Sequence, residues 1–293
     1  MNLKSNLEMA AGELLAAGVP EPDLDAWYLL EYVTGVSRAA YFADPDRELT
    51  EAQQETFDAC VKKRAGRIPL QHITGTQEFM GLSFRVNEHV LIPRQDTESL
   101  VEEALKMLKK RAVPADNRDG QTTEILDLCT GSGCILLSVL HYAGQEEHMN
   151  LRGTGSDLSE QALETARGNA EHLGIRARFI HSDLFGSLPG RYAMILSNPP
   201  YIRSGDLEEL QPEVRLHDPG MALDGGADGL AFYRRITEES PAHLEDNGIL
   251  IFEIGCDQAA DVSELMRAHG FTDITVKKDL AGLDRVVYGR YSK

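Results

Sequence analysis

The sequence has few cysteines, and they form no recognisable motif. The four cysteines among 293 residues include no Cys-x-x-Cys pair and no cysteine–histidine cluster at zinc spacing. The nine histidines are scattered, without a His-Glu-x-x-His motif. The sequence therefore predicts neither a disulfide framework nor a metal site.

Long apolar runs and an excess of positive charge are also missing. No apolar stretch approaches the ~18 residues that cross a bilayer, and Lys4, Glu8 and Glu13 interrupt the region where a signal peptide would be apolar. With 29 lysines and arginines against 47 aspartates and glutamates, the net charge is −18. A generally basic surface for coating nucleic acid is therefore excluded. We expect a soluble cytoplasmic protein that binds neither membrane nor nucleic acid.

The length and composition are those of a globular protein. At about 150 residues per domain, 293 residues suggest two domains. A content of 42% hydrophobic and 26% charged residues excludes the disordered and collagen-like classes.

Residues 1–75 have the periodicity of helices. Apolar residues at steps of three and four predict a buried stripe on each of two helices: Leu7, Ala11, Leu14 and Leu15, then Leu24, Tyr28 and Tyr32. Pro20 and Pro22 separate these helices, Gly35 ends the second, and Thr50 with Gln53 forms a capping box for another. We predict a small helical bundle over residues 1–75.

Residues 76–92 suit short strands, with Gly81 as the turn and residues 90–92 as a further strand, and we assign them to a β-hairpin linker. The remainder, residues 93–293, forms the second predicted domain. Asp96 is expected to cap a helix through about Leu108, and the polar stretch from Pro114 to Thr122 to form a loop.

From residue 124 onward, apolar runs alternate with helical stretches. The predicted strands are 124–128, 152–156, 176–181, 192–197, 248–254, 273–277 and 284–289. Helices are expected near 134–143, 159–173, 228–239 and 257–268. This alternation predicts an α/β fold with a doubly wound, mostly parallel seven-stranded sheet. The last two strands are too close for a helix between them and should form an antiparallel hairpin.

A glycine-rich turn follows the first strand of this sheet. Asp127 precedes the loop Cys129, Thr130, Gly131, Ser132, Gly133. A dinucleotide site would need a third glycine where Leu136 stands. The spacing acid-x-x-x-Gly-x-Gly is instead typical of S-adenosylmethionine sites, although an ordinary βα turn is also compatible with it.

Two further acids follow the next two strands. Asp157 ends the second strand, where a carboxylate can accept hydrogen bonds from ribose hydroxyls. Asp183 follows the third, where an acid can take the amine of adenine while Leu184 packs on the ring. Either acid alone could be a helix cap.

The fourth strand runs into Asn198-Pro199-Pro200-Tyr201. The two prolines fix φ and remove two N–H donors, so the turn presents carbonyl oxygens without competing donors. Together with the Asn198 amide oxygen, these can accept both hydrogens of a substrate –NH2 group. Tyr201 supplies a flat wall for a planar group, and the alternative is a plain Asn-Pro turn.

Several other stretches extend this pattern along the chain. They are residues 69–75, 78–79, 91–98, 222–226, 228–230, 233–234, 253–255 with Gln258, 279–282 and 284–285. With the Asn-Pro-Pro-Tyr turn, they resemble the protein-(glutamine-N5) methyltransferases that modify peptide chain release factors, within the class I S-adenosylmethionine-dependent methyltransferases. The resemblance covers nearly all of the chain from Pro69 onward. The departures are Cys129 for glycine, Gln95 for proline, His72 for tyrosine, and Leu184 at a place that is often aromatic.

This resemblance implies an enzyme that methylates the glutamine of a Gly-Gly-Gln loop in release factors. It implies cofactor contacts at Asp127, residues 129–133, Asp157, Asp183, Leu184 and Asn198, and substrate contacts at Asn198, Pro199, Pro200 and Tyr201. Asn198, Pro199 and Tyr201 would be catalytic, and residues 1–75 would dock the release factor. The alternatives are a methyltransferase acting on adenine N6 or cytosine N4 of nucleic acid, and a non-catalytic binding subunit.

Overall fold

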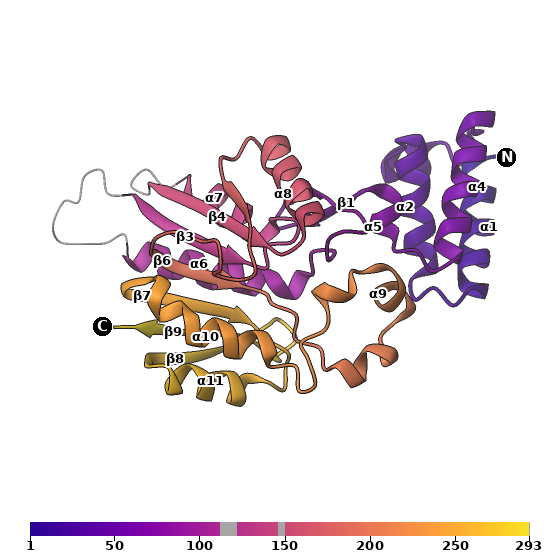
Figure 1. The fold of residues 1–293 in the computed structure, drawn as a ribbon. Coiled ribbons are helices and arrows are strands. Elements are labelled where there is room, and N and C mark those ends of the chain that lie inside the picture. Colours follow the sequence, from indigo (N-terminus) through magenta and orange to yellow (C-terminus); the bar gives the residue numbers. More distant parts are fainter. Residues whose placement is uncertain (112–121, 146–149, 293) are drawn as a thin grey trace. The chain divides into compact units, whose positions relative to one another are not determined.

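The chain divides into two units in the computed structural model, which describes residues 1–111, 122–145 and 150–292 (Figure 1). The first unit comprises residues 1–76 together with 211–217, and the second comprises residues 77–210 and 218–293. The sequence alone assigned residues 211–217 to the second domain, whereas here they belong to the first unit. The loop predicted from Pro114 lies, apart from Thr122, outside the described residues.

The first unit is helical. Its helices are α1 (Leu3–Ala16), α2 (Pro22–Thr34), α3 (Arg38–Ala43), α4 (Glu51–Ala65), α5 (Leu70–Thr74) and α9 (Pro212–His217). Gly35 ends α2 in the left-handed conformation, and both hydrogen bonds of the Thr50–Gln53 capping box are present. The predicted helical bundle is confirmed.

The apolar stripe predicted for α2 is wrong, because a different face of the helix is buried. Ala26, Leu29 and Leu30 are fully buried, whereas Tyr28 and Tyr32 are 43% and 52% exposed. Both series have helical spacing, and a helix packed on one side can bury only one of them. On α1, likewise, Leu14 is buried but Leu15 is exposed.

A buried charge network holds α9 in the first unit. Arg64 Nε lies 2.6 Å from Asp25 Oδ2, and Arg64 Nη2 lies 2.9 Å from Glu213 Oε1. Arg67 binds both Glu213 oxygens through Nε and Nη2, at 2.7 and 2.6 Å. Burial raises the pKa of Glu213, but the hydrogen bonds from Arg67 and Arg64 outweigh it and hold this pKa at about 2.

The second unit begins with a hairpin of β1 (Thr76–Phe79) and β2 (Leu82–Arg85). Phe79 and Phe84 are buried in the core of this unit. The strand predicted at residues 90–92 is wrong: Val90 and Ile92 are buried, but the segment pairs with no strand and runs into Pro93, which lacks a donor.

The helix expected to be capped by Asp96 begins slightly later. Asp96 lies within the 3₁₀ turn η1 (Gln95–Thr97), which leads into α6 (Glu98–Arg111). Its carboxylate pairs with Arg285 at 3.3 Å instead of capping the helix.

A seven-stranded sheet forms the centre of the second unit, with strand order β5-β4-β3-β6-β7-β9-β8. The strands are β3 (Thr123–Leu128), β4 (Leu151–Asp157), β5 (Arg178–His181), β6 (Tyr192–Ser197), β7 (Leu244–Glu253), β8 (Phe271–Lys278) and β9 (Asp284–Tyr291). β3 to β7 pair in parallel, and β9 is antiparallel to both β7 and β8. The predicted fold class, including the terminal hairpin, is confirmed.

Both faces of the sheet are covered, because successive strand residues point to opposite sides. One core joins Ile125 and Met194 to α6 and α7 (Cys134–Ala143). The other joins Leu126 and Ile195 to α10 (Ala231–His243) and α11 (Ala259–Ala268). The remaining elements are α8 (Glu160–Leu173), η2 (Ser204–Glu209) and η3 (Gly220–Ala222). Among the described residues, none of the helices combines the length and apolar character of a membrane span.

The charge network of the first unit gives a stability prediction. Glu213→Gln should lower the free energy of unfolding of this unit by about 2–3 kcal/mol at pH 7, because the buried Arg64 and the partly buried Arg67 lose a carboxylate. The pKa of Glu213 is lowered in the folded protein, so its contribution is present above pH 4.5. It is lost as the pH falls toward 2, where variant and wild type should converge.

The measurement is urea unfolding followed by tryptophan fluorescence, since Trp27 is the single tryptophan and is buried in the first unit. Glu55→Gln, at an exposed position of α4, is the control and should shift the midpoint little. Equal midpoints for Glu213→Gln and wild type would show that the network adds no stability.

Candidate active site

The glycine-rich loop lies between β3 and α7 and turns sharply. Cys129, Gly131 and Gly133 have φ of 57°, 54° and 79°. A Cβ at Gly133 would also lie 3.2 Å from the Ala166 Cβ. A left-handed backbone conformation is more strained for a cysteine than for a glycine, so glycine would suit position 129 better.

Asp157, at the end of β4, ties this loop to the start of α8. Its Oδ2 accepts a hydrogen bond from the Gly131 N–H and its Oδ1 accepts one from the Ser159 N–H, each at 2.9 Å. Burial raises the pKa of Asp157, and these hydrogen bonds lower it. Each carboxylate oxygen keeps acceptor capacity, so this side chain can serve the loop and a ligand hydroxyl together.

Asp127 lies beneath the loop and is fully buried. Its Oδ2 accepts a hydrogen bond of 2.5 Å from the Thr130 hydroxyl. Burial raises the pKa of Asp127 to about 7, despite the hydrogen bond from Thr130. In this structure Asp127 therefore supports the loop from below.

Asp183 and Leu184 follow β5 and differ in environment. The Asp183 side chain is 58% exposed and pairs with Arg235 of α10 at 3.0 Å. Leu184 is buried and adopts φ of 47°. A polar and an apolar side chain are therefore adjacent at the end of β5.

The Asn-Pro-Pro-Tyr turn follows β6 and is fixed by its neighbours. A Cβ at Gly225 would lie 2.7 Å from Tyr201 Cα and 2.8 Å from the Pro200 carbonyl oxygen, so only glycine permits this approach. Gln258 Nε2 donates to the Tyr201 carbonyl at 2.9 Å, and the Tyr201 hydroxyl donates to Glu253 Oε1 at 3.3 Å. The Pro200 carbonyl oxygen therefore lies against the Gly225 backbone.

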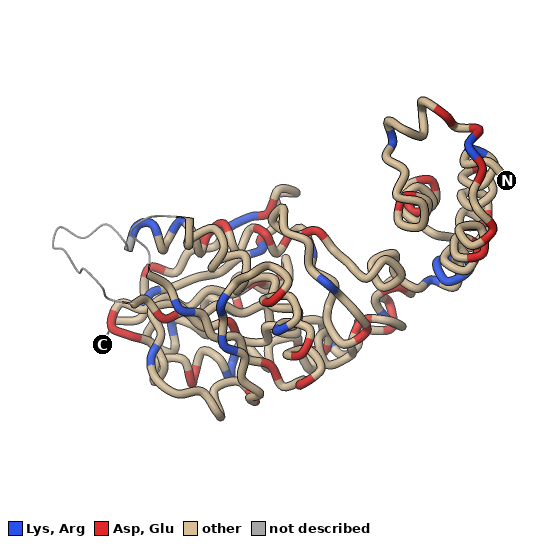
Figure 2. The backbone as a smooth tube through the Cα atoms, turned by 90° about the horizontal axis from the view of Figure 1, so that it is seen from above, with Lys and Arg blue, Asp and Glu red and all other residues tan. Residues whose placement is uncertain are grey.

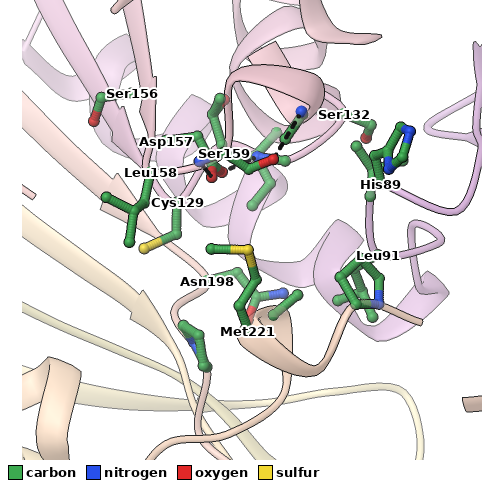
Figure 3. Close-up of a pocket in the computed structure, with 18 of the residues that line it drawn as sticks. His89, Leu91, Cys129, Ser132, Ser156, Asp157, Leu158, Ser159, Asn198 and Met221 are labelled. Carbon is green, nitrogen blue, oxygen red and sulfur yellow. Dashed lines mark hydrogen bonds between the residues drawn. The ribbon is translucent and has the colours of Figure 1, made fainter. Parts of the chain in front are cut away.

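One pocket of about 340 Å³ collects most of the predicted residues (Figure 3). Its lining includes Cys129, Thr130, Gly131, Ser132, Asp157, Asp183, Leu184, Asn198 and Pro200. Asp127, Gly133, Pro199 and Tyr201, which were also predicted, lie outside this lining. Three acids, Asp157, Asp183 and Asp224, line the pocket with one arginine, Arg94, and this excess of acids favours a cationic ligand.

The sequence analysis missed part of the pocket wall. His89, Leu91, Arg94, Met221 and Phe232 line it as well, and Figure 3 shows His89, Leu91 and Met221 around Asn198 and Ser132. Of these, only Leu91 and Arg94 fall in a stretch that carries the resemblance, residues 91–98, to which no role was assigned. Their place in the pocket depends on tertiary contacts, which the sequence pattern does not show.

An ion pair connects Arg94 to the segment that precedes Pro219. Arg94 Nη2 lies 2.7 Å from Asp218 Oδ2, and the Asp218 side chain is buried. Burial raises the pKa of Asp218 to about 6, although Arg94 lowers it. Asp218 is next to the short segment that contributes Pro219 and Met221 to the pocket.

Two family models match the chain. Residues 6–75 match the PrmC N-terminal domain, and residues 101–213 match the methyltransferase small domain. The chain is 42% identical over 287 residues to the release factor glutamine methyltransferase of Agrobacterium fabrum, covering 97% of this chain and 96% of that protein. It is 40% identical to that of Geobacter sulfurreducens, covering 98% and 96%.

A solved structure shares the fold. The hMettl16 catalytic domain, in complex with the MAT2A 3′UTR hairpin 6, has a TM-score of 0.53 with this chain, at 14% identity and with 83% of each chain covered. At this identity, the similarity concerns the arrangement of strands and helices alone.

Proposed function

The chain belongs to the family of release factor glutamine methyltransferases, and we propose that it transfers a methyl group from S-adenosylmethionine to the side-chain amide nitrogen (N5) of a release factor glutamine. The acceptor is the glutamine of the Gly-Gly-Gln loop. Because release factors act on cytoplasmic ribosomes, the enzyme is proposed to be cytoplasmic.

The observation that carries this proposal is the position of Asn198 in the pocket, beside the glycine-rich loop. A carboxamide nitrogen is a poor nucleophile, because its lone pair is delocalised into the carbonyl. Asn198 Oδ1, as an acceptor on one of its hydrogens, aligns the nitrogen and stabilises the positive charge that grows on it. Tyr201, outside the pocket lining, supports the turn from behind through Glu253 and Gln258.

The cofactor fits the other half of the pocket. S-adenosylmethionine supplies a methyl group on a positively charged sulfur, and the acidic lining favours such a cation. Residues 129–132 let the ligand approach the backbone, Asp157 accepts from the ribose hydroxyls, and Asp183 with Leu184 receives the adenine. Asp127 and Gly133 act indirectly, by holding the shape of the loop.

We assign substrate docking to the helical first domain, residues 1–75. A site that reads only an –NH2 group cannot choose one glutamine among all those on cellular proteins, so other contacts must provide specificity. The helical unit has an apolar surface for such contacts, since Tyr28 and Tyr32 of α2 are exposed one turn apart.

The nucleic-acid alternative is disfavoured by the charges of the second unit. Five of its arginines are paired with acids: Arg94 with Asp218, Arg203 with Asp257, Arg234 with Asp228, Arg235 with Asp183, and Arg285 with Asp279. Figure 2 shows acidic residues interspersed with basic ones along the backbone. Phosphate binding needs unneutralised positive charge. A non-catalytic role is disfavoured because Asn198 and Asp157 are both present at the pocket.

If Asp157 binds the ribose, removing its carboxylate should weaken the binding of S-adenosylmethionine more than that of an analogue without the 2′-hydroxyl. Asp157→Ala should weaken cofactor binding by about 1–3 kcal/mol, because ribose hydroxyls lose their acceptor. Since Asp157 also holds the Gly131 N–H, calorimetry should compare S-adenosylmethionine with its 2′-deoxyribose analogue in a double-mutant cycle. Wild type should prefer the natural cofactor and Asp157→Ala should not. An unchanged preference in the variant would remove Asp157 from the ribose.

The function itself is tested by offering three acceptors with labelled S-adenosylmethionine. They are an intact release factor, a short Gly-Gly-Gln peptide, and RNA or DNA. The label should enter the release factor and be recovered as N5-methylglutamine, because the site is shaped for a carboxamide. Label confined to nucleic acid would contradict the proposal.

The same assay tests docking by the helical domain. Tyr28→Ala combined with Tyr32→Ala should lower kcat/KM for the intact factor while leaving the peptide's kcat/KM unchanged, because the short peptide has no second contact to lose. Equal losses on both substrates would show that these tyrosines do not dock the factor.

A further inference from the structure

Four consecutive apolar residues are exposed in the turn between β8 and β9. They are Leu280, Ala281, Gly282 and Leu283, which we call the Leu-Ala-Gly-Leu turn. The two leucines are 107% and 47% exposed. Folding gains nothing from a leucine in water, so an exposed apolar run of this length indicates a surface that a partner covers.

The Leu-Ala-Gly-Leu turn has a defined conformation. Asp279 Oδ1 accepts a hydrogen bond from the Leu283 N–H at 3.0 Å, and the Asp279 N–H donates to the Leu283 carbonyl at 2.9 Å. The Gly282 N–H donates to the Asp279 carbonyl at 3.0 Å, and Gly282 has the left-handed φ of 81°. Because these bonds fix the backbone before a partner arrives, binding to the turn costs little conformational entropy.

A buried ion pair anchors the turn to a wall of the pocket. The Asp279 side chain is 1% exposed, and its Oδ2 lies 3.1 Å from Arg285 Nε and 3.0 Å from Arg285 Nη2. The same Nη2 lies 3.3 Å from Asp96 Oδ2. Asp96 stands between Arg94 and Thr97, and both of these residues line the pocket.

The order of the strands gives the distance from this turn to the Asn-Pro-Pro-Tyr turn. Val286, near the start of β9, pairs with Glu253 at the end of β7. Phe252 of β7 pairs with Ser197 at the end of β6, so only β7 separates β6 from β9. With neighbouring strands about 4.8 Å apart, β9 starts about 10 Å from the end of β6. The Leu-Ala-Gly-Leu turn therefore lies at the same edge of the sheet as Asn198.

The surroundings of the turn define what can cover it. Residues 279–285, all of which the structure describes, lie outside the pocket lining, so a ligand held in the pocket does not cover them. The charges that flank the turn neutralise each other, since Lys278 Nζ lies 3.1 Å from Asp284 Oδ1. The occupant must therefore offer an apolar surface next to whatever enters the pocket.

We propose that the Leu-Ala-Gly-Leu turn is a docking surface for the release factor, and that it contacts an apolar patch beside the Gly-Gly-Gln loop. The inference rests on the proposed function, because a protein whose glutamine enters the pocket brings its surrounding surface to this edge of the sheet. It adds a contact in the second unit to the docking that we assign to residues 1–75.

The main test replaces both leucines by serine. Leu280→Ser combined with Leu283→Ser should raise KM for the intact release factor about tenfold, because buried apolar surface is lost from the complex. We expect little change in kcat, because the contact is equally strong in the ground state and in the transition state. The Kd for S-adenosylmethionine and the melting temperature should stay at their wild-type values, since both side chains are exposed outside the pocket.

A blocked Gly-Gly-Gln tripeptide is the matched substrate control. At about 3.6 Å per extended residue, it is too short to reach from the pocket to the Leu-Ala-Gly-Leu turn. Its kcat/KM should therefore be the same for the serine double variant and for wild type.

Two further variants test the chemistry of the contact. Leu280→Met combined with Leu283→Met keeps the apolar surface and should restore most of the affinity for the factor. Val276→Thr, at a position of β8 that is 37% exposed, is the matched control and should leave KM unchanged. The ratio of KM between serine variant and wild type should be the same at low and high ionic strength, because the leucines carry no charge.

Photo-cross-linking identifies the occupant directly. The chain with p-benzoylphenylalanine in place of Leu280 should, on irradiation with the release factor, form a covalent link to it. Mass spectrometry should place that link in the surface that adjoins the Gly-Gly-Gln loop.

The outcomes separate this inference from the proposed function. If the wild-type chain does not methylate the release factor, the proposed function fails. If wild type is active and the serine double variant keeps the wild-type KM, or loses as much on the tripeptide as on the factor, the docking role is wrong. Cross-links that join only two copies of this chain would assign the turn to self-association and overturn it too, as would a melting temperature that falls in step with affinity.

Discussion

Parallel pairing of β3 with β6 is the constraint on which the site depends. Leu128 pairs with Ser197, so the glycine-rich loop and the Asn-Pro-Pro-Tyr turn leave the same edge of the sheet as neighbours. The Ser197 hydroxyl donates to the Leu128 carbonyl at 2.9 Å and ties the two strand ends together. A cofactor loop and an amide-binding turn, far apart in sequence, thereby line one pocket.

The rigidity of the turn comes from segments behind it. Gly225 lets one backbone approach Pro200 and Tyr201, and Gln258 holds the Tyr201 carbonyl from another loop. Ile202 also exchanges hydrogen bonds with Leu223 and Gly225. Alignment of a weak nucleophile needs such fixed acceptors, because a shift of about 1 Å can cost a large part of the rate.

Much of the sheet was predictable because its signal is local. Each predicted strand from 124 to 289 was found, since apolar runs between helical stretches leave few alternatives. Other features were not predictable because they depend on tertiary contacts. The choice between the Tyr28 face and the Leu29 face of α2 follows from packing, and the place of Glu213 in the first unit follows from two arginines about 146 residues away. The segments that bring Arg94 and Met221 to the pocket have no apolar periodicity. The burial of Asp127 depends on how the loop that follows it folds.

The central claim is that Asn198 acts on the charge that develops on the glutamine nitrogen. The most direct measurement is the steady-state kinetics of Asn198→Ala on an intact release factor, with the melting temperature as a check on folding. The account predicts that kcat falls by about 100-fold or more while KM for the factor changes little, because the interaction is strongest in the transition state. A loss confined to KM, or an unchanged kcat, would contradict it.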